Sequence, residues 1–221
     1  MHGQNSIPRP SVTRLPYYYR RLMRAIEQGE EVISSDELGA AAGVPAAQVR
    51  KDLNYLGGLG RAGIGYEVRG LAEVLREFLG LSHRQRAIVV GAGNLGRALA
   101  AYPGFELYGL QIVALFDIDP AKIGTSIAGK AVCPLDELAG EVLRRDVHMG
   151  IITVPADQAQ AVADLMVKAG IQVIWNFAPQ RLQVPTEVLL ENEDLAARVA
   201  RMSYYITHGD SASATDHRIA R

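Results

Sequence analysis

The hydrophobic pattern of the chain changes near residue 82. Up to that point apolar residues recur every three or four positions, which is typical of amphipathic helices. From residue 87 onward they gather in short β-branched runs separated by helical stretches. The first pattern predicts a small helical domain over residues 1–82. The second predicts an α/β domain, because strands that alternate with helices form a parallel sheet with right-handed crossovers.

The N-terminal region carries four predicted helices, after a polar, proline-rich stretch that we expect to be irregular up to residue 16. The predicted helices span residues 17–28, 34–42, 46–56 and 71–81. Ser34 is a residue type that caps helices, and Gly43 is one that ends them. Pro45 can open the next helix, because proline is tolerated in a first turn. The two short helices predict a helix-turn-helix, although such pairs also occur as structural hairpins.

The second helix of this pair has an apolar spine formed by Val49, Leu53 and Leu56 and a polar outer face. Basic and amide side chains on such a face can reach phosphates or base edges in a major groove. The candidate DNA contacts in this region are Gln48, Arg50, Lys51, Asn54 and Tyr55. Arg14, in an arginine-rich stretch, is a further candidate phosphate contact, and the alternative there is a solvated helix face.

A glycine-rich segment follows the helix pair. Residues 57–65 hold five glycines, and Ile64, Tyr66 and Val68 then alternate with polar or small residues. This pattern predicts a hairpin followed by a half-buried strand, and so the wing of a winged helix with Arg61 near a minor groove. The alternative is an ordinary glycine-rich loop.

Residues 87–96 carry the pattern typical of a dinucleotide-binding turn. A β-branched run leads into G-x-G-x-x-G, and a helical pattern follows. The candidate cofactor contacts in the turn are Gly91, Ala92, Gly93, Asn94, Leu95 and Gly96. Asp117 ends the next apolar run, 21 residues after Gly96. A carboxylate there is expected to accept both ribose hydroxyls and to repel a 2′-phosphate, which favours NAD over NADP. The alternative is a glycine turn used only for packing.

The α/β region is expected to hold strands at 87–91, 111–117, 148–154 and 171–177, with helices at 94–102, 135–145 and 156–169. Ligands of parallel sheets bind at the carboxyl ends of the strands. Further candidate cofactor contacts at these ends are Thr153, Val154, Pro155, Asn176, Ala178 and Pro179. Each of these loops, taken alone, can equally be an ordinary strand-to-helix turn.

A helix is expected near the C-terminus, with Asn192 as its cap. Leu195, Val199, Met202 and Ile206 form a narrow apolar stripe along it, which packs either on the chain's own core or on a partner subunit. The expected divisions are thus a winged-helix domain over 1–82, a Rossmann domain over 83–186, a dimerisation helix over 187–208 and a polar tail over 209–221.

The composition of the chain restricts the partners and sites that it can have. The chain has 221 residues, 48% of them hydrophobic, and a formal net charge of −1, so any DNA-binding surface must be local. A single cysteine, Cys133, can form neither an internal disulfide nor a cysteine cluster. No apolar run approaches membrane-spanning length. We therefore expect a cytoplasmic protein with no membrane or metal partner.

Six motifs together resemble the Rex family of bacterial redox-sensing repressors. They are residues 49–57 (VRKDLNYLG), 63–66 (GIGY), 90–96 (VGAGNLG), 116–120 (FDIDP), 176–179 (NFAP) and 203–206 (SYYI). The resemblance implies a homodimer that binds an inverted-repeat operator and releases it when NADH binds, with NAD⁺ competing. It also implies a C-terminal helix exchanged between subunits.

By motif match, the resemblance places Tyr102 near the nicotinamide. It implies that Asp194 bonds to Tyr102 of the other subunit in one state and pairs with Arg20 in the other. The chain also departs from the family pattern. Leu56 and Leu195 stand where the family commonly has aromatic residues, and Ala62 follows Arg61 where a Lys-Arg pair is frequent.

Two other functions are alternatives to a redox-sensing repressor. An NAD-dependent dehydrogenase needs an acid or base beside the nicotinamide and room for a substrate domain. Few residues follow the predicted sheet, and none of the histidines stands at the carboxyl end of a predicted strand: His2, His83, His148, His208 and His217. A DNA-binding protein with a CoA-type nucleotide in the same fold is the other alternative, and Asp117 argues against it only moderately.

Overall fold

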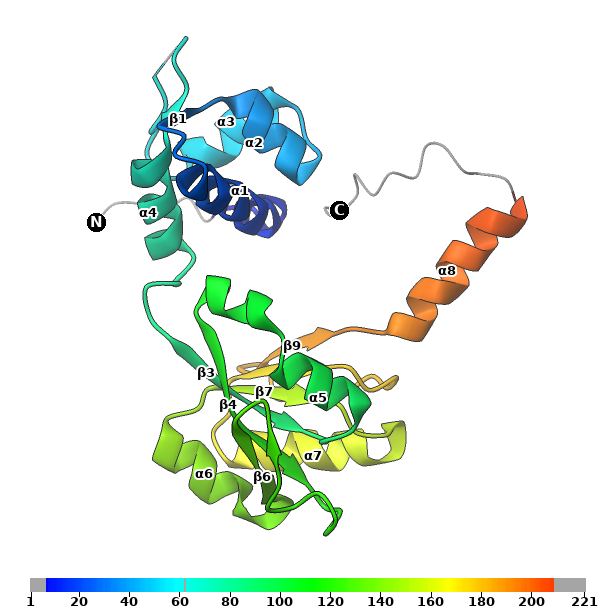
Figure 1. The fold of residues 1–221 in the computed structure, drawn as a ribbon. Coiled ribbons are helices and arrows are strands. Elements are labelled where there is room, and N and C mark those ends of the chain that lie inside the picture. Colours follow the sequence, from blue (N-terminus) through cyan, green and yellow to red (C-terminus); the bar gives the residue numbers. More distant parts are fainter. Residues whose placement is uncertain (1–6, 62, 209–221) are drawn as a thin grey trace. The chain divides into compact units, whose positions relative to one another are not determined.

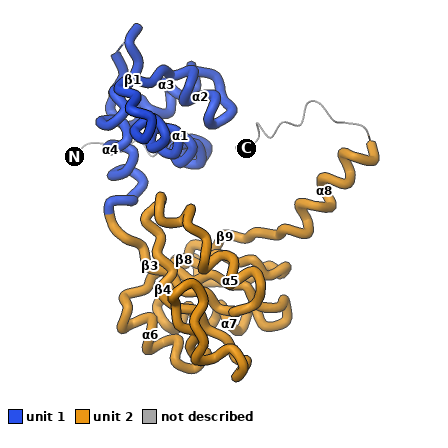
Figure 2. Tube along the Cα trace, in the orientation of Figure 1, with its two compact units in different colours: residues 1–82, 210–221 blue, residues 83–209 orange. Residues whose placement is uncertain are grey.

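The computed structural model describes residues 7–61 and 63–208. The chain divides into two compact units, one up to Ser82 and one from His83, which are coloured apart in Figure 2. This division lies near residue 82, where the hydrophobic pattern of the sequence changes. The last predicted segment, residues 209–221, and Ala62 lie outside the described residues.

The first unit is a winged helix-turn-helix. Its elements are α1 (Arg9–Glu27), β1 (Val32–Ile33), α2 (Ser35–Ala42), α3 (Ala46–Asn54), β2 (Tyr66–Glu67) and α4 (Val68–Phe78). The predicted cap of α2 is confirmed: Ser34 Oγ accepts from the Glu37 N–H, and the Glu37 carboxylate accepts from the Ser34 N–H. Gly43 ends α2 with a positive φ of 67°. The helix pair therefore has the tight turn that its sequence predicted.

The N-terminal helix is longer than predicted. α1 begins at Arg9, so the expectation of an irregular stretch up to residue 16 was wrong for its second half. Pro10 lies in the first turn, where proline loses no hydrogen bond. Ser11 and Leu15 are buried. Packing of this face stabilises the helix despite Pro16 in its interior, because tertiary contacts contribute more to helix stability than propensity does.

The wing differs from the predicted strand. β2 is only two residues long and pairs antiparallel with β1, which was not predicted because two residues show no periodicity. Ile64 is 61% exposed near the loop tip, which an isolated bridge between Arg61 and Gly65 closes. Val68 does not continue the strand but begins α4. The alternation from Ile64 to Val68 was therefore misread as one half-buried strand.

The second unit is a Rossmann-type layer structure (Figure 1). Its elements are β3 (Gln85–Val90), α5 (Asn94–Ala100), η1 (Pro103–Tyr108), β4 (Leu110–Asp117), β5 (Ser126–Ile127), β6 (Lys130–Pro134), η2 (Leu135–Glu137), α6 (Leu138–Arg145), β7 (Met149–Ile152), α7 (Ala156–Lys168), β8 (Val173–Asn176), β9 (Leu189–Asn192) and α8 (Leu195–His208). The sheet order is β5-β6-β4-β3-β7-β8-β9, and all pairs are parallel except β5 with β6. The four predicted strands are confirmed, whereas β5, β6 and β9 were not predicted.

Two apolar layers cover the sheet. Alternate residues of β3 point to opposite faces: Ile88 and Val90 pack with α6 and α7, while Ala87 and Val89 pack on the side of α5 and η1. The chain passes outward from the central β3 to β4 and β6, then crosses back to β7. This reversal beside β3 defines the point where open α/β sheets bind ligands.

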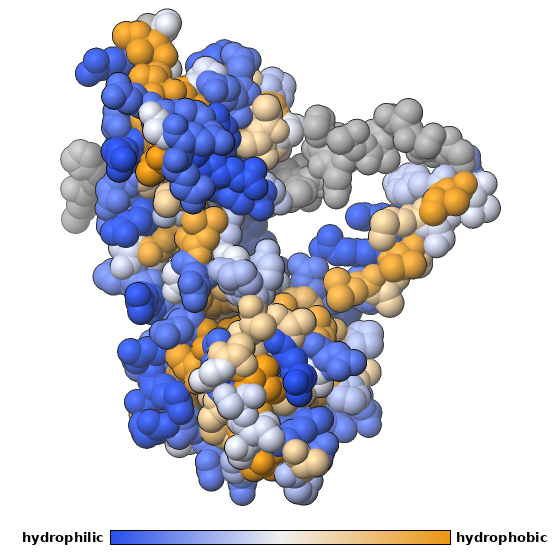
Figure 3. Space-filling view, viewed as in Figure 1, coloured by the Kyte–Doolittle hydropathy of each residue, from blue (hydrophilic) through white to orange (hydrophobic). Residues whose placement is uncertain are grey.

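Helix α8 has no buried residue among those described. Its apolar stripe is visible as orange atoms in Figure 3, and Leu195, Val199, Met202 and Ile206 are 52–83% exposed. The predicted cap was wrong, because Asn192 lies in β9. Asp194 Oδ1 instead accepts from the Ala197 N–H at 2.9 Å. Among the described residues, the stripe therefore does not pack on the core of its own chain.

In the described part of the chain, no helix combines the length and apolar character needed to cross a membrane.

Candidate functional site

Three strand ends meet at the reversal point of the sheet. Gly91 follows β3, Asp117 ends β4, and Thr153 follows β7. The Gly91 N–H donates to Phe116 at 2.8 Å, and Thr153 Oγ1 donates to the Gly91 carbonyl at 2.8 Å. These bonds fix the turn before α5 against both neighbouring strands. The predicted residues Gly91, Asp117 and Thr153 are thus brought together.

The glycines of the turn have different roles. Gly91 has a φ of +104°, and a Cβ there would stand 2.7 Å from the Thr153 carbonyl oxygen. A Cβ on Gly96 would stand 2.0 Å from the Gly91 carbonyl oxygen. Both positions therefore require glycine for packing of the turn itself. Gly93 differs, because a Cβ there would meet nothing within 4 Å and so would point into open space.

A cleft of about 570 Å³ opens beside this turn. Its lining residues are Val90, Gly91, Gly93, Leu95, Asp117, Ile118, Asp119, Lys122, Leu135, Thr153, Val154, Pro155, Gln158, Val162 and Phe177. The charged members all come from the β4 end and the loop after it. The end formed by residues 153–155 and Phe177 is lined by uncharged side chains among the residues described. The cleft thus has one charged and one apolar end.

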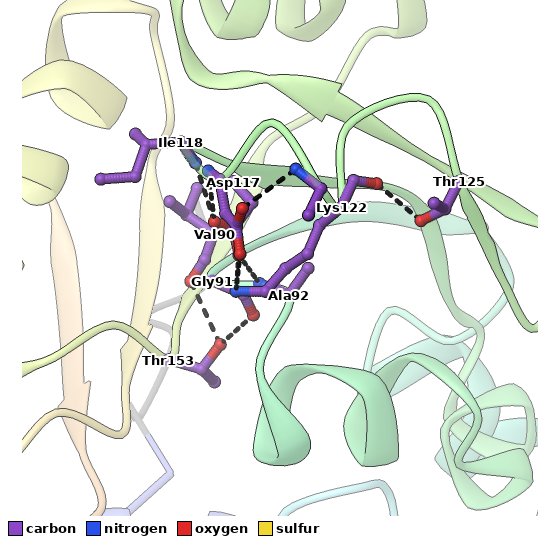
Figure 4. A network of polar contacts seen from close by, with 10 residues as sticks. Val90, Gly91, Ala92, Asp117, Ile118, Lys122, Thr125 and Thr153 are labelled. Atoms are coloured by element: carbon purple, nitrogen blue, oxygen red, sulfur yellow. Dashed lines mark hydrogen bonds and ion pairs between the residues drawn. The ribbon is translucent and has the colours of Figure 1, made fainter.

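Asp117 is the centre of the charged end (Figure 4). Its Oδ1 accepts from the backbone N–H groups of Ile118 and Asp119, both at 2.9 Å. Its Oδ2 accepts from the Ala92 N–H at 2.8 Å and from Lys122 Nζ at 3.0 Å. In this state both oxygens that were expected to receive ribose hydroxyls already accept internal donors.

The protonation of this cluster follows from its hydrogen bonds. Burial alone would raise the pKa of Asp117, but the donors around it, first the Asp119 N–H and then Lys122, lower that pKa below its usual value. The hydrogen bond to Asp117 raises the pKa of Lys122. Asp117 is therefore a carboxylate and Lys122 an ammonium at neutral pH.

The first unit presents a separate groove of about 510 Å³ between α2, α3 and the wing. Arg50, Asn54 and Arg61 line it, each exposed. Lys51 and Tyr55 are also exposed on or beside α3. These five predicted DNA contacts are therefore on the surface of the unit, where a nucleic acid can reach them.

The other two predicted DNA contacts lie elsewhere. Asp52 on α3 is fully buried and accepts from Arg14 Nε and Nη2, both at 2.7 Å. It also accepts from Tyr18 Oη and Gln48 Nε2, both at 2.8 Å. Arg14 and Gln48 donate to Asp52 in this structure, and their contact with DNA stays a prediction. The Arg14 bonds fix α3 against α1, whereas the Gln48 bond lies within α3.

Loss of the Asp52 charge should strongly destabilise the first unit. We expect Asp52→Asn to lower the free energy of unfolding by about 3 kcal/mol, because it leaves the Arg14 guanidinium, whose side chain is only 13% exposed, without its counterion. Burial alone would raise the pKa of Asp52, but the hydrogen bonds it accepts, first of all from Arg14, lower that pKa. This stability is present above the unfolded-state pKa, about 3.9, and is lost as pH falls through the lower folded value.

Urea unfolding at several pH values measures this effect. The gap between the wild-type protein and Asp52→Asn should be constant near neutrality and should shrink below about pH 4. Glu27→Gln, at an exposed position on the end of α1, serves as the control and should change little. A gap that persists unchanged into strong acid would contradict the role given to the Asp52 charge.

Both units match known protein families. Residues 82–180 match the family model described as "CoA binding domain", and residues 6–54 match "Putative DNA-binding protein N-terminus". The redox-sensing transcriptional repressor Rex of Syntrophomonas wolfei is 44% identical over 200 residues, which cover 90% of this chain and 95% of that protein. The Rex of Chloroflexus aurantiacus is 45% identical over 195 residues, covering 88% and 92%. The chain belongs to the Rex family.

Solved structures agree with this assignment. RSP in complex with β-NAD⁺ and operator DNA has a TM-score of 0.84 and 40% identity, covering 90% of this chain and 92% of that one. RSP, described as a Rex-family repressor, and RSP in complex with β-NADH both have TM-scores of 0.80. The predicted family is therefore confirmed, as is the fold class of a winged helix followed by a Rossmann-type domain, whereas the exchange of the C-terminal helix between subunits stays a prediction. The Rex relatives are named repressors, in agreement with a regulator rather than a dehydrogenase.

Within this Rex-family chain, half of the predicted cofactor residues line the cleft: Gly91, Gly93, Leu95, Asp117, Thr153, Val154 and Pro155. The others do not line it: Ala92, Asn94, Gly96, Tyr102, Asn176, Ala178 and Pro179. Asn176 is fully buried, and its Nδ2 donates to Gln180 O and Asn192 Oδ1, both at 2.9 Å. It therefore fixes the loop after β8 to β9.

Several residues that line the cleft were not predicted from the sequence. Ile118, Asp119 and Lys122 follow β4 in the D-x-D-P-x-K stretch, and the alternation of charge there was the available signal. Leu135, Gln158, Val162 and Phe177 come from elements on either side of the cleft. Only the folded sheet brings these four together.

The three residues assigned to a Rex switch are all exposed. Arg20 lies over the Tyr17 ring, 5.3 Å from its centroid. Tyr102 packs edge-on against Phe105 and is 57% exposed. Asp194 caps α8 with one oxygen. Arg20 belongs to the first unit and the other two to the second, so their predicted exchange of partners stays a prediction.

Proposed function

We propose that this Rex-family chain is a cytoplasmic, homodimeric repressor that binds an inverted-repeat operator and releases it when NADH enters the cleft. The observation that carries the proposal is the pairing, in one chain, of an exposed basic recognition helix with a dinucleotide-type cleft. Its relative RSP has been solved with operator DNA and β-NAD⁺ and, separately, with β-NADH. Both ligands of the proposal therefore have a place in a close structural relative.

The cleft supports selection of the reduced cofactor. NAD⁺ carries a cationic nicotinamide ring, whereas that of NADH is neutral. We place the nicotinamide at the apolar end, near Thr153, Val154 and Phe177. Burying an unpaired cation there costs free energy that a neutral ring does not incur, so NADH is bound more tightly without any reaction.

The exposed stripe on α8 supports the dimer. Leu195, Val199 and Met202 are each more than half exposed in the single chain, and a partner subunit would bury them. If closure of the dimer around NADH changes the spacing of the two α3 helices, they no longer match operator half-sites one helical turn or a multiple apart. Coupling of this kind is reciprocal: operator DNA must weaken NADH binding by the same factor.

A titration of the protein–operator complex with NADH, NAD⁺, NADPH and CoA tests this function. Fluorescence anisotropy of labelled operator DNA should fall with NADH at concentrations where the other three leave it unchanged. CoA is included because the matched family model describes a CoA-binding domain. Release by CoA but not by NADH would transfer the proposal to the other nucleotide, and equal release by NADH and NAD⁺ would refute redox sensing.

A further inference from the structure

The charged end of the cleft leaves no unoccupied acceptor on Asp117. A carboxylate offers about four lone-pair sites, and four donors fill them here: the N–H groups of Ala92, Ile118 and Asp119, and the Lys122 ammonium. Three of these donors belong to the backbone and are fixed by the turn. A ribose hydroxyl can therefore bond to Asp117 only by displacing Lys122.

Lys122 is the sole cation among the described residues that line the cleft. Its Nζ lies 3.0 Å from Asp117 Oδ2 and 3.6 Å from Asp119 Oδ2, and its side chain is 38% exposed. An ammonium has three donors. With one on Asp117 and one directed at Asp119, the third is available to a ligand in the cleft.

We propose that Lys122, rather than a free Asp117 carboxylate, meets the adenosine ribose, and that Asp119 makes the site reject a ribose phosphate. This inference rests on the proposed function, because it assumes a dinucleotide in this cleft. A ribose hydroxyl oxygen accepts from the third Lys122 donor. A 2′-phosphate meets instead a corner with two carboxylates and one ammonium.

Asp119 decides the sign of the net charge of this corner, which consists of Asp117, Asp119 and Lys122. A lysine facing the ribose would by itself attract the 2′-phosphate, which carries close to two negative charges at neutral pH. The two carboxylates exceed the single ammonium by one negative charge and also hold the ammonium between them. Without the Asp119 charge the corner is neutral and Lys122 can turn to the phosphate. Two acids, not one, are therefore needed to exclude NADPH.

Two variants with opposite expected effects test the assignment. Asp119→Asn keeps an oxygen acceptor for the Ala121 N–H, so the turn is preserved. We expect it to lower the ratio of the NADPH to the NADH dissociation constant by about tenfold, by strengthening NADPH binding. Lys122→Gln should weaken NADH by several-fold and NADPH by more, so that the ratio rises. Glu137→Gln, at an exposed position outside the cleft, is the control.

The binding titrations can follow Trp175, the single tryptophan of the chain, whose ring centroid lies 4.7 Å from that of the cleft residue Phe177. An unchanged ratio in Asp119→Asn, or a shift of both variants in the same direction, would overturn the inference while NADH binding by the wild-type protein still supports the proposed function. A wild-type protein that binds neither dinucleotide would refute the proposed function and this inference with it.

Discussion

Gly93→Val is expected to abolish the response to NADH while leaving operator binding intact. A Cβ at Gly93 meets nothing within 4 Å, so the larger side chain can be accommodated by the folded protein. It occupies the space through which a pyrophosphate would approach the turn, because a dinucleotide needs close backbone contact there. We expect NADH affinity to fall at least about a hundredfold. The valine side chain would prevent the whole pyrophosphate from reaching the turn, rather than remove a single contact.

Operator release by NADH, followed by anisotropy, is the measurement. Gly96→Ala is the contrasting variant, because its Cβ would stand 2.0 Å from the Gly91 carbonyl oxygen and the turn itself must shift. That variant should lower thermal stability, whereas Gly93→Val should not. If Gly93→Val still releases DNA at wild-type NADH concentrations, the cofactor does not pass this turn.

The two glycine variants illustrate what the sequence predicted of the cleft. The spacing G-x-G-x-x-G after a β-branched run located the turn, because strand, turn and helix are local structures with local signals. It did not separate glycines that pack the turn from the glycine that faces a ligand. That distinction depends on Thr153, which follows β7 and reaches the turn from more than fifty residues later in the sequence.

Asp117 shows a second limit on what could be predicted from the sequence. Its position at the end of β4 followed from the pattern, but its free acceptor capacity did not. The loop after β4 folds back so that two of its N–H groups and Lys122 bind the same carboxylate. Such a loop has no periodicity in its sequence. Only its folded path shows that Lys122 already occupies the carboxylate that was expected to bind the ribose.

The burial of Asp52, unlike its partners, follows from its position in the sequence. Asp52 was given no role from the sequence, although it is three residues after Val49 and directly before Leu53, both buried. Helical spacing alone places it on the apolar spine. A carboxylate at such a position needs a buried partner, and the arginine-rich α1 supplies it. Arg14 was predicted as a phosphate contact, which stays a prediction, and in the structure its guanidinium pairs with Asp52.

Replacement of both Arg50 and Lys51 by alanine should nearly eliminate operator binding. Both side chains are exposed on α3, so their removal leaves the core of the first unit unchanged. A good base contact contributes about 1–3 kcal/mol, and the proposed dimer would lose four side chains. We expect an affinity loss of at least about a thousandfold, with a salt dependence that is flatter by about 0.9 for each phosphate contact removed.

Operator affinity measured from low to high salt separates the two kinds of contact. A loss that is uniform across unrelated DNA sequences, with a flatter slope, identifies phosphate contacts, whereas a loss confined to the operator identifies base contacts. Arg76→Ala is the matched control, because Arg76 is exposed on α4 and pairs with Glu73 at 3.2 Å. NADH binding should be unaffected in both variants, since the cleft lies in the second unit. If the double variant kept the operator affinity and the salt dependence of the wild-type protein, α3 would not be part of the DNA interface.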